Sequence, residues 1–320
     1  MEFSPAYVLG FEDRLSSIVN EDYLLAAKNL WWPMLMMSRP TDGRTETIEF
    51  LLSTAQIHPL DDGQMVYDDL VAAAFRIENK DKGGALKVTK NQFKDDKLEK
   101  AAGWAAQMGV QIAMRPQLDA IALIKAGETN LGYDGVAFFS TAHPVHPFAP
   151  SLGTYSNLIT SNPLVDVDGK PIIANYAKAI GRLRSFIMPN GQNRNLQPLY
   201  LVVGPDLAFA AQLLTQARFI DASENVFNTG FGLKQNGVLV PGVQVIVINE
   251  LAAGEWYVVA SDVGMAVAPL IYSEREPYEM TTYDGITQVM LNIENVLEWQ
   301  VRGRNDAIYG HPYSMVKSKP

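Results

Sequence analysis

The chain has 320 residues, of which 48% are apolar, and it carries 26 Lys and Arg against 35 Asp and Glu, a formal net charge of −9. This size and apolar content can bury one large or two linked domains, and the acidic balance disfavours sequence-independent binding to the phosphate backbone of DNA. The absence of cysteine excludes disulfides, thiolate metal sites and a cysteine nucleophile. The first residues lack the layout of a signal peptide, and no apolar run approaches the roughly 20 residues of a membrane helix.

Residues 1–40 are predicted to form an arm with helical content. Residues 11–19 and 23–30 are amphipathic at helical spacing. Trp31 and Trp32 follow, beside a proline and several methionines. Tryptophan and methionine suit an adaptable contact surface, and they equally suit ordinary core packing.

Long strands are predicted in residues 41–93. Residues 45–50 alternate between apolar and polar side chains, residues 74–79 and 85–90 indicate two more strands, and residues 80–84 indicate a turn between those two. The acidic segment between the first two strands is either a solvated surface or a binding site for a divalent cation. We expect the region to project from the body, where open strand edges would invite pairing with another chain.

One long helix is predicted over residues 95–126. Asp95 or Asp96 can cap its start, apolar residues recur at three- and four-residue steps, and Gly127 is a stop signal. At ~1.5 Å per residue the helix would measure roughly 45 Å. Such a rod can be the spine of a flat subunit, or it can be a buried helix of an ordinary enzyme.

The remaining elements indicate a loop region followed by a compact α/β unit and a long strand. Their predicted order is a loop at 140–150, an amphipathic helix at 173–186, a strand at 199–203, a helix at 207–217, a glycine- and asparagine-rich exposed loop at 227–237, strands at 244–248 and 256–260, a long strand at 285–302, and a short basic end at 317–320.

Chemistry-bearing motifs are scarce. His143 and His146 lie near Asp134, which permits a metal or general-base interpretation, but each histidine precedes a proline in a predicted turn. A hydrolase would use His143, Asp134 and Ser140. Phosphate-binding, dinucleotide-binding and nucleophile-elbow motifs are absent from the sequence. We therefore predict no catalytic residue, no metal and no cofactor.

The order of several short motifs resembles the major head subunit (T protein) family of Mu-like phages. The motifs are Asn79-Lys80, residues 86–90 and 93–96 ahead of the long helix, Tyr133-Asp134-Gly135, Phe138-Phe139, His143-Pro144, Ser156-Asn157, Arg302-Gly303-Arg304 and Tyr309-Gly310. The resemblance runs from Thr45 to Tyr313.

This resemblance implies an α+β fold of the Hong Kong 97 phage capsid type. The implied parts are an N-terminal arm (1–40), an extended loop (41–80), a peripheral domain with the spine helix and long strands (81–195 and 268–320), and an axial α/β domain (196–267). Many copies would form pentamers and hexamers in an icosahedral shell around phage DNA. An encapsulin-like nanocompartment shell is the alternative of the same fold.

The implied partners are other copies of the chain, a scaffold-protease during assembly, a portal, a decoration protein, and packaged DNA held without sequence-specific binding, with no membrane. The implied location is the virion capsid, after assembly in the host cytoplasm. The candidate contact residues between subunits are Trp31, Trp32, Asp61, Asp62, Tyr67, Asp68, Asp69, Asn228, Phe231, Lys234, Asn236, Arg302 and Arg304.

Overall fold

The computed structural model describes residues 5–51, 72–89, 99–216, 243–260, 267–281 and 296–320. Its helices are α1 (Pro5–Ala27), α2 (Trp32–Leu35), α4 (Glu99–Ala126), α5 (Ile173–Arg184) and α6 (Ala208–Gln216). Its strands are β1 (Met36–Pro40), β2 (Thr45–Leu51), β3 (Ala72–Glu78), β4 (Lys80–Thr89), β5 (His143–Pro144), β6 (Thr154–Tyr155), β7 (Leu158–Ile159), β8 (Tyr200–Val203), β9 (Gln244–Val247), β10 (Trp256–Val259), β11 (Leu270–Thr281), β12 (Val296–Tyr309) and β13 (Met315–Ser318).

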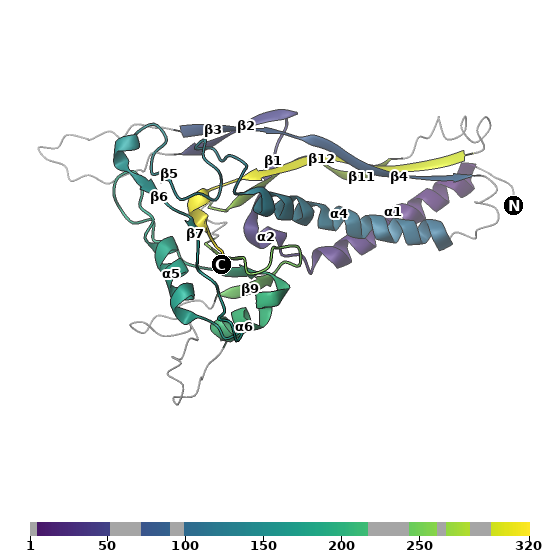
Figure 1. The fold of residues 1–320 in the computed structure, drawn as a ribbon. Helices are drawn as coiled ribbons and strands as arrows, with labels where there is room; N and C mark the ends of the chain where they lie inside the picture. Colours follow the sequence, from purple (N-terminus) through teal and green to yellow (C-terminus); the bar gives the residue numbers. More distant parts are fainter. Residues whose placement is uncertain (1–4, 52–71, 90–98, 217–242, 261–266, 282–295) are drawn as a thin grey trace, which may run out of the picture.

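A sheet in the order β1-β11-β12-β4, the long sheet, runs along one side of the molecule (Figure 1). β1 is parallel to β11, and the other neighbours are antiparallel. The turn predicted at residues 80–84 is wrong, because these residues form the first half of β4 and pair with β12. A Cβ at Gly83 would collide with the backbone oxygen of Val301, so this glycine permits close strand pairing instead of a turn.

The predicted C-terminal strand ends later than expected, and its predicted first part, residues 285–295, lies outside the described residues. β12 continues to Tyr309, past the predicted end at residue 302, and Arg302-Gly303-Arg304 lies inside it. A Cβ at Gly303 would meet the ring of Tyr278 on β11, which explains a glycine in the middle of a strand.

Two helices cover one face of the long sheet (Figure 1). α4 contains the predicted spine helix from Glu99 onward, and residues 95–98 lie outside the described part. The arm segments expected at 11–19 and 23–30 form one helix, α1, which ends at Ala27, before the predicted end at residue 30, and packs along α4. Leu15 and Val19 of α1 are buried with Ala105 of α4 and Trp299 of β12. The N-terminal helix thus shares a core with the spine helix of its own chain.

The antiparallel hairpin β2–β3 lies against the opposite face of the long sheet (Figure 1). Ile48, Phe50 and Ile77 are buried against Ile271 of β11 and Ile308 of β12. The described base of the hairpin therefore packs on the body, whereas the acidic piece at 58–69 lies outside the described residues.

A second sheet, the small sheet, has the order β7-β13-β10-β8-β9 and lies at one end of the long helices (Figure 1). One of its faces shares a core with the C-terminal half of α4 and with the long sheet, and the other is covered by α5 and α6. Burial on both faces explains why β8 and β10 are continuous apolar runs. The prediction missed β13: the segment expected as a basic end lies between β7 and β10.

Candidate assembly surfaces

The root of the hairpin is held by a buried polar network. The side-chain amide of Asn79 donates to Thr41 Oγ1 at 2.9 Å and to the carbonyl oxygen of Gly43 at 3.0 Å. Ser273 Oγ donates to Asn79 Oδ1 at 2.9 Å, and the hydroxyls of Thr41 and Ser273 are 2.9 Å apart. Asn79 joins β3 to β4, and Ser273 lies on β11, so the network fixes the hairpin to the long sheet.

We expect Asn79→Ala to loosen the hairpin and to lower the free energy of unfolding by about 1–3 kcal/mol, because buried polar groups lose their partner. Hydrogen exchange of β2 and β3 and urea unfolding measure the two effects. Glu78→Gln is the matched control, since its ion pair with Arg44 is exposed and such pairs contribute about 0–1 kcal/mol. Equal effects of the two substitutions would contradict the anchoring role of Asn79.

Of the predicted contact residues, Arg302 and Arg304 lie on β12 and bind acidic groups of their own chain. Arg302 Nη2 is 3.3 Å from Asp81 Oδ2, Arg304 Nε also binds Asp81, and Arg304 Nη1 is 3.2 Å from Glu276 Oε1. The hydrogen bond from Arg304 holds the pKa of Asp81 below its ordinary value. The arginines therefore connect β12 to its two neighbouring strands, while the Arg302 side chain keeps 56% exposure.

Trp31 and Trp32 are half-buried against the core between α4 and the long sheet. The backbone N–H of Trp31 donates to Gln117 Oε1 at 3.3 Å, and the Trp32 ring lies 5.6 Å from that of Tyr272. Both side chains thus take part in core packing within the chain, which was one of the two sequence interpretations.

The other predicted contact residues lie outside the described part of the chain. They are Asp61, Asp62, Tyr67, Asp68, Asp69, Asn228, Phe231, Lys234 and Asn236. Their contact role stays a prediction.

An ion cluster joins the C-terminal strand to the end of α4. Lys317 Nζ lies 2.8 Å from Glu128 Oε1 and 2.7 Å from Glu255 Oε1, and Lys319 Nζ lies 2.7 Å from Glu128 Oε2. Lys317 is only 3% exposed. Burial by itself would raise the pKa of Glu128, but the hydrogen bonds from Lys317 and Lys319 outweigh burial and hold this pKa below its ordinary value of 4.5. Sequence reasoning missed this cluster because its members are far apart in the chain.

The cluster predicts a dependence of stability on pH. Because the pKa of Glu128 is lowered by folding, its contribution is complete above the unfolded pKa and is lost as pH falls through the folded pKa. We expect Glu128→Gln to reduce the fall in unfolding free energy between about pH 5 and pH 3. Chemical denaturation across this range checks the slope. The exposed Glu250→Gln should keep the slope of the parent chain, and a parent slope in Glu128→Gln would contradict the assignment.

His143 and Asp134, the pair behind the hydrolase alternative, are brought together and buried. His143 Nδ1 is 2.6 Å from Asp134 Oδ2, and the two side chains are 0% and 3% exposed. His143 Nε2 lies 3.2 Å from the carbonyl oxygen of Phe138. A histidine that activates a serine must present to that serine the nitrogen remote from its carboxylate. Here this nitrogen faces a backbone carbonyl, and Ser140 Oγ instead accepts the N–H of Ala142 at 3.2 Å. The geometry is that of a structural pair.

In the described ranges, no group of three or more His, Asp or Glu side chains could hold a metal ion. None of the helices in those ranges is long and apolar enough to cross a membrane.

Comparison with known proteins shows which protein family this chain resembles. A family model described as Mu-like prophage major head subunit gpT matches residues 15–170. Over this region, just under half of its length, the chain is similar to that family. The major capsid protein of Escherichia phage Mu is 33% identical over 100 residues, which are 31% of this chain and 32% of that protein. The alignment thus spans about a third of this curated relative, and it supports the predicted family resemblance.

Solved structures show which fold the chain has. The capsid of bacteriophage JBD30 decorated with minor capsid protein trimers matches with a TM-score of 0.54 at 18% identity, over 71% of this chain and 93% of that chain. The mature capsid of bacteriophage PhiM1 gives 0.53 at 15% identity, over 91% and 87%. A virus-like particle from Pyrococcus furiosus gives 0.52 at 10% identity, over 96% and 98%. The predicted α+β phage capsid fold of the Hong Kong 97 type is confirmed.

Proposed function

We propose that this chain is a major capsid protein, which assembles as pentamers and hexamers into an icosahedral shell around phage DNA. The observation that carries the proposal is the capsid-type fold together with the match to a head-subunit family. The role is structural, not enzymatic, and the buried His143–Asp134 pair supports this because it serves no exposed nucleophile.

The shape of the chain supports assembly by overlap of neighbouring copies. The hairpin β2–β3 is a separate sheet of two strands in the described residues, and such a hairpin is marginal by itself. In our proposal the extended loop (41–80) lies over a neighbouring copy and the arm (1–40) contacts another. The peripheral domain comprises 81–195 and 268–320, and the axial domain 196–267. The small sheet also takes β7 and β13 from the peripheral segments.

The proposed partners follow from the family. They are further copies of the chain, a scaffold-protease, a portal, a decoration protein and DNA enclosed without sequence-specific contacts. Assembly would take place in the host cytoplasm, and the mature location would be the virion capsid. The acidic net charge of −9 supports an inner wall that does not hold DNA tightly.

The proposal is tested by expressing the chain alone and with its scaffold-protease, followed by sedimentation and negative-stain microscopy. We expect closed particles in at least one of the two conditions. Deletion of residues 61–69 should leave a folded subunit that no longer forms particles. A chain that remains monomeric in both conditions would overturn the proposal, and normal particle yield from the deletion would exclude an assembly role for that acidic segment.

A shell around protein cargo is the second candidate, as in an encapsulin-like nanocompartment. It is favoured by the likeness to the virus-like particle from Pyrococcus furiosus, which covers 98% of that chain. The contents of purified particles decide between the two candidates: packaged DNA supports the phage head, and a co-purifying enzyme supports the nanocompartment.

A further inference from the structure

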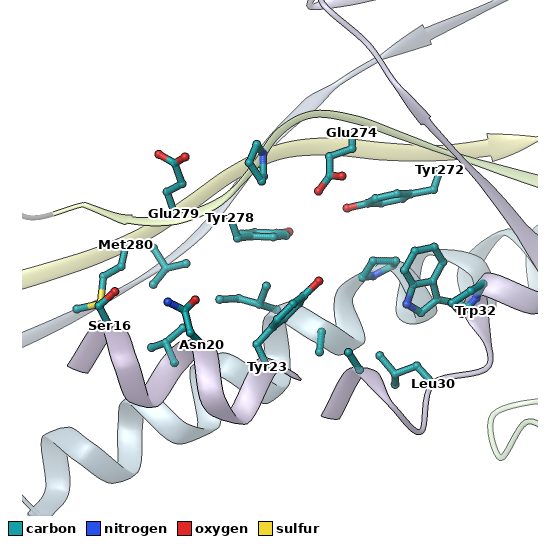
Figure 2. Close-up of a pocket in the computed structure, with 18 residues that line it drawn as sticks. Ser16, Asn20, Tyr23, Leu30, Trp32, Tyr272, Glu274, Tyr278, Glu279 and Met280 are labelled. Carbon is teal, nitrogen blue, oxygen red and sulfur yellow. The ribbon is translucent and has the colours of Figure 1, made fainter. Parts of the chain in front are cut away.

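A cavity of about 550 Å³ lies between α1, α2, α4 and β11 (Figure 2). α1 and α4 form one side of it, and β11 passes over the other side. Four aromatic side chains line it, and they come from three separate elements: Tyr23 from α1, Trp32 from α2, and Tyr272 and Tyr278 from β11. The cavity is therefore created by the way α1 and α2 pack against the long sheet.

The aromatic rings surround the cavity rather than filling it. In Figure 2 the ring of Tyr23 rises from α1 toward Tyr278, and Tyr272 and Trp32 lie at the opposite end. The rings of Trp32 and Tyr272 are 5.6 Å apart and tilted by 51°. Tyr272 is 3% exposed and Tyr23 is 39% exposed, so the cavity has a closed end and an open end. Aromatic faces carry partial negative charge and attract organic cations.

Two carboxylates add negative charge to this wall, and no described lining residue is basic. Glu274 and Glu279 both line the cavity, and the Glu274 carboxylate lies between Tyr272 and Tyr278 in Figure 2. Burial first, and the charge of Glu274 second, raise the pKa of Tyr272.

The nearby basic groups are already bound to other partners. Arg115 and Lys82 bind the carboxylate of Asp119 at 2.8 and 2.5 Å. Burial raises the pKa of Tyr278, and the charge of Arg115 opposes this rise. Within the described residues, Glu274 has no ion-pair partner. The cavity thus combines aromatic faces with a carboxylate that has no ion-pair partner among the described residues.

We propose that this cavity binds an organic cation, an ammonium or guanidinium group that sits among the rings of Tyr23, Tyr272 and Tyr278 and is neutralised by Glu274. Two sources carry this chemistry: a lysine or arginine side chain of a second copy, and a free polyamine. All lining residues belong to one subunit, so the binding of a cation does not depend on the proposed shell function, whereas the distinction between the two sources rests on it.

Calorimetric titration of the unassembled full chain tests the site. The probes are n-butylammonium and n-butylguanidinium, with uncharged n-pentanol as the neutral analogue. We expect the cations to bind and the alcohol not to bind at the same concentrations. Glu274→Gln and Tyr278→Leu should each weaken cation binding by about tenfold or more, equivalent to roughly 1.4 kcal/mol. Glu298→Gln makes the same charge change on β12 outside the cavity and should bind as the parent does.

Equal binding of alcohol and cation, or unchanged binding by Glu274→Gln, would overturn the proposal. Circular dichroism at the titration temperature shows whether Tyr278→Leu is folded, and Glu274→Gln gives an independent result if it is not. Titration of assembled particles with spermidine then identifies the source. If subunits bind spermidine and particles do not, a side chain of a neighbouring copy occupies the cavity in the particle. If both bind spermidine, the natural ligand is a free polyamine.

Discussion

Gly109→Leu is expected to detach α1 from α4 and to lower the free energy of unfolding by roughly 3 kcal/mol or more. A Cβ at this position would collide with the carbonyl oxygen of Val19 and lie 3.0 Å from the backbone nitrogen of Tyr23. Both neighbours are helix backbone, which cannot turn aside as a flexible side chain can. The larger residue therefore displaces α1 and exposes Leu15 and Trp299, whose burial depends on this contact.

Gly103→Ala is the matched control for this prediction. Gly103 lies on the same helix, and a Cβ there meets nothing within 4 Å. Replacing an exposed helical glycine by alanine should raise stability by about 0.5–1 kcal/mol. Urea unfolding gives the two free energies, and limited proteolysis near residue 28 reports release of α1. A melting temperature of Gly109→Leu equal to that of the parent would show that α1 does not depend on this close approach.

His143→Ala is expected to cost about 3–5 kcal/mol, because it leaves the carboxylate of Asp134 buried beside an empty space. Asp134 Oδ1 keeps the N–H of Val136 at 3.2 Å, but Oδ2 loses its 2.6 Å partner. The substitution also removes the 3.2 Å contact between His143 Nε2 and the carbonyl oxygen of Phe138, to which Asn157 still donates at 2.7 Å. Thermal and chemical unfolding measure the effect.

The control for this second prediction is His146→Ala, since the His146 ring accepts an exposed backbone N–H from Phe148 at 3.1 Å and otherwise meets the Phe148 ring edge-on. It should change stability by about 0.5 kcal/mol or less. A double-mutant cycle of His143→Ala with Asp134→Ala should give a coupling energy well above zero, because the double variant no longer contains a lone buried charge. Additive effects would mean that the two side chains do not stabilise each other.

The local sequence pattern was enough to predict the helices and strands whose buried residues follow a recognisable apolar spacing. The helix α4 follows from apolar spacing, and β8 and β10 follow from short apolar runs. Gly83 misled the prediction because a glycine in a turn and a glycine under a neighbouring backbone look the same in a sequence. β13 was missed because a strand containing Lys317 is stable only beside Glu128 and Glu255.

The candidate assembly surface was predicted less completely than the fold. Asn79 was recognised as part of a family motif, but its partners Thr41 and Ser273 are distant in sequence. Arg302 and Arg304 are predicted to contact other copies, which stays a prediction, and the structure shows that both bind Asp81 within the chain. In each case the interaction depends on which strands become neighbours, and local patterning does not determine that.

The order of strands in the long sheet has a consequence for how the chain reaches its native state. β1 begins at Met36, and its neighbour β11 begins at Leu270, near the other end of the chain. Pairing of such distant segments requires closure of a very long loop, which slows folding relative to locally connected topologies. Until β11 arrives, both edges of β1 are unpaired, which favours aggregation. Refolding from denaturant should accordingly be slow, and its yield should fall as protein concentration rises.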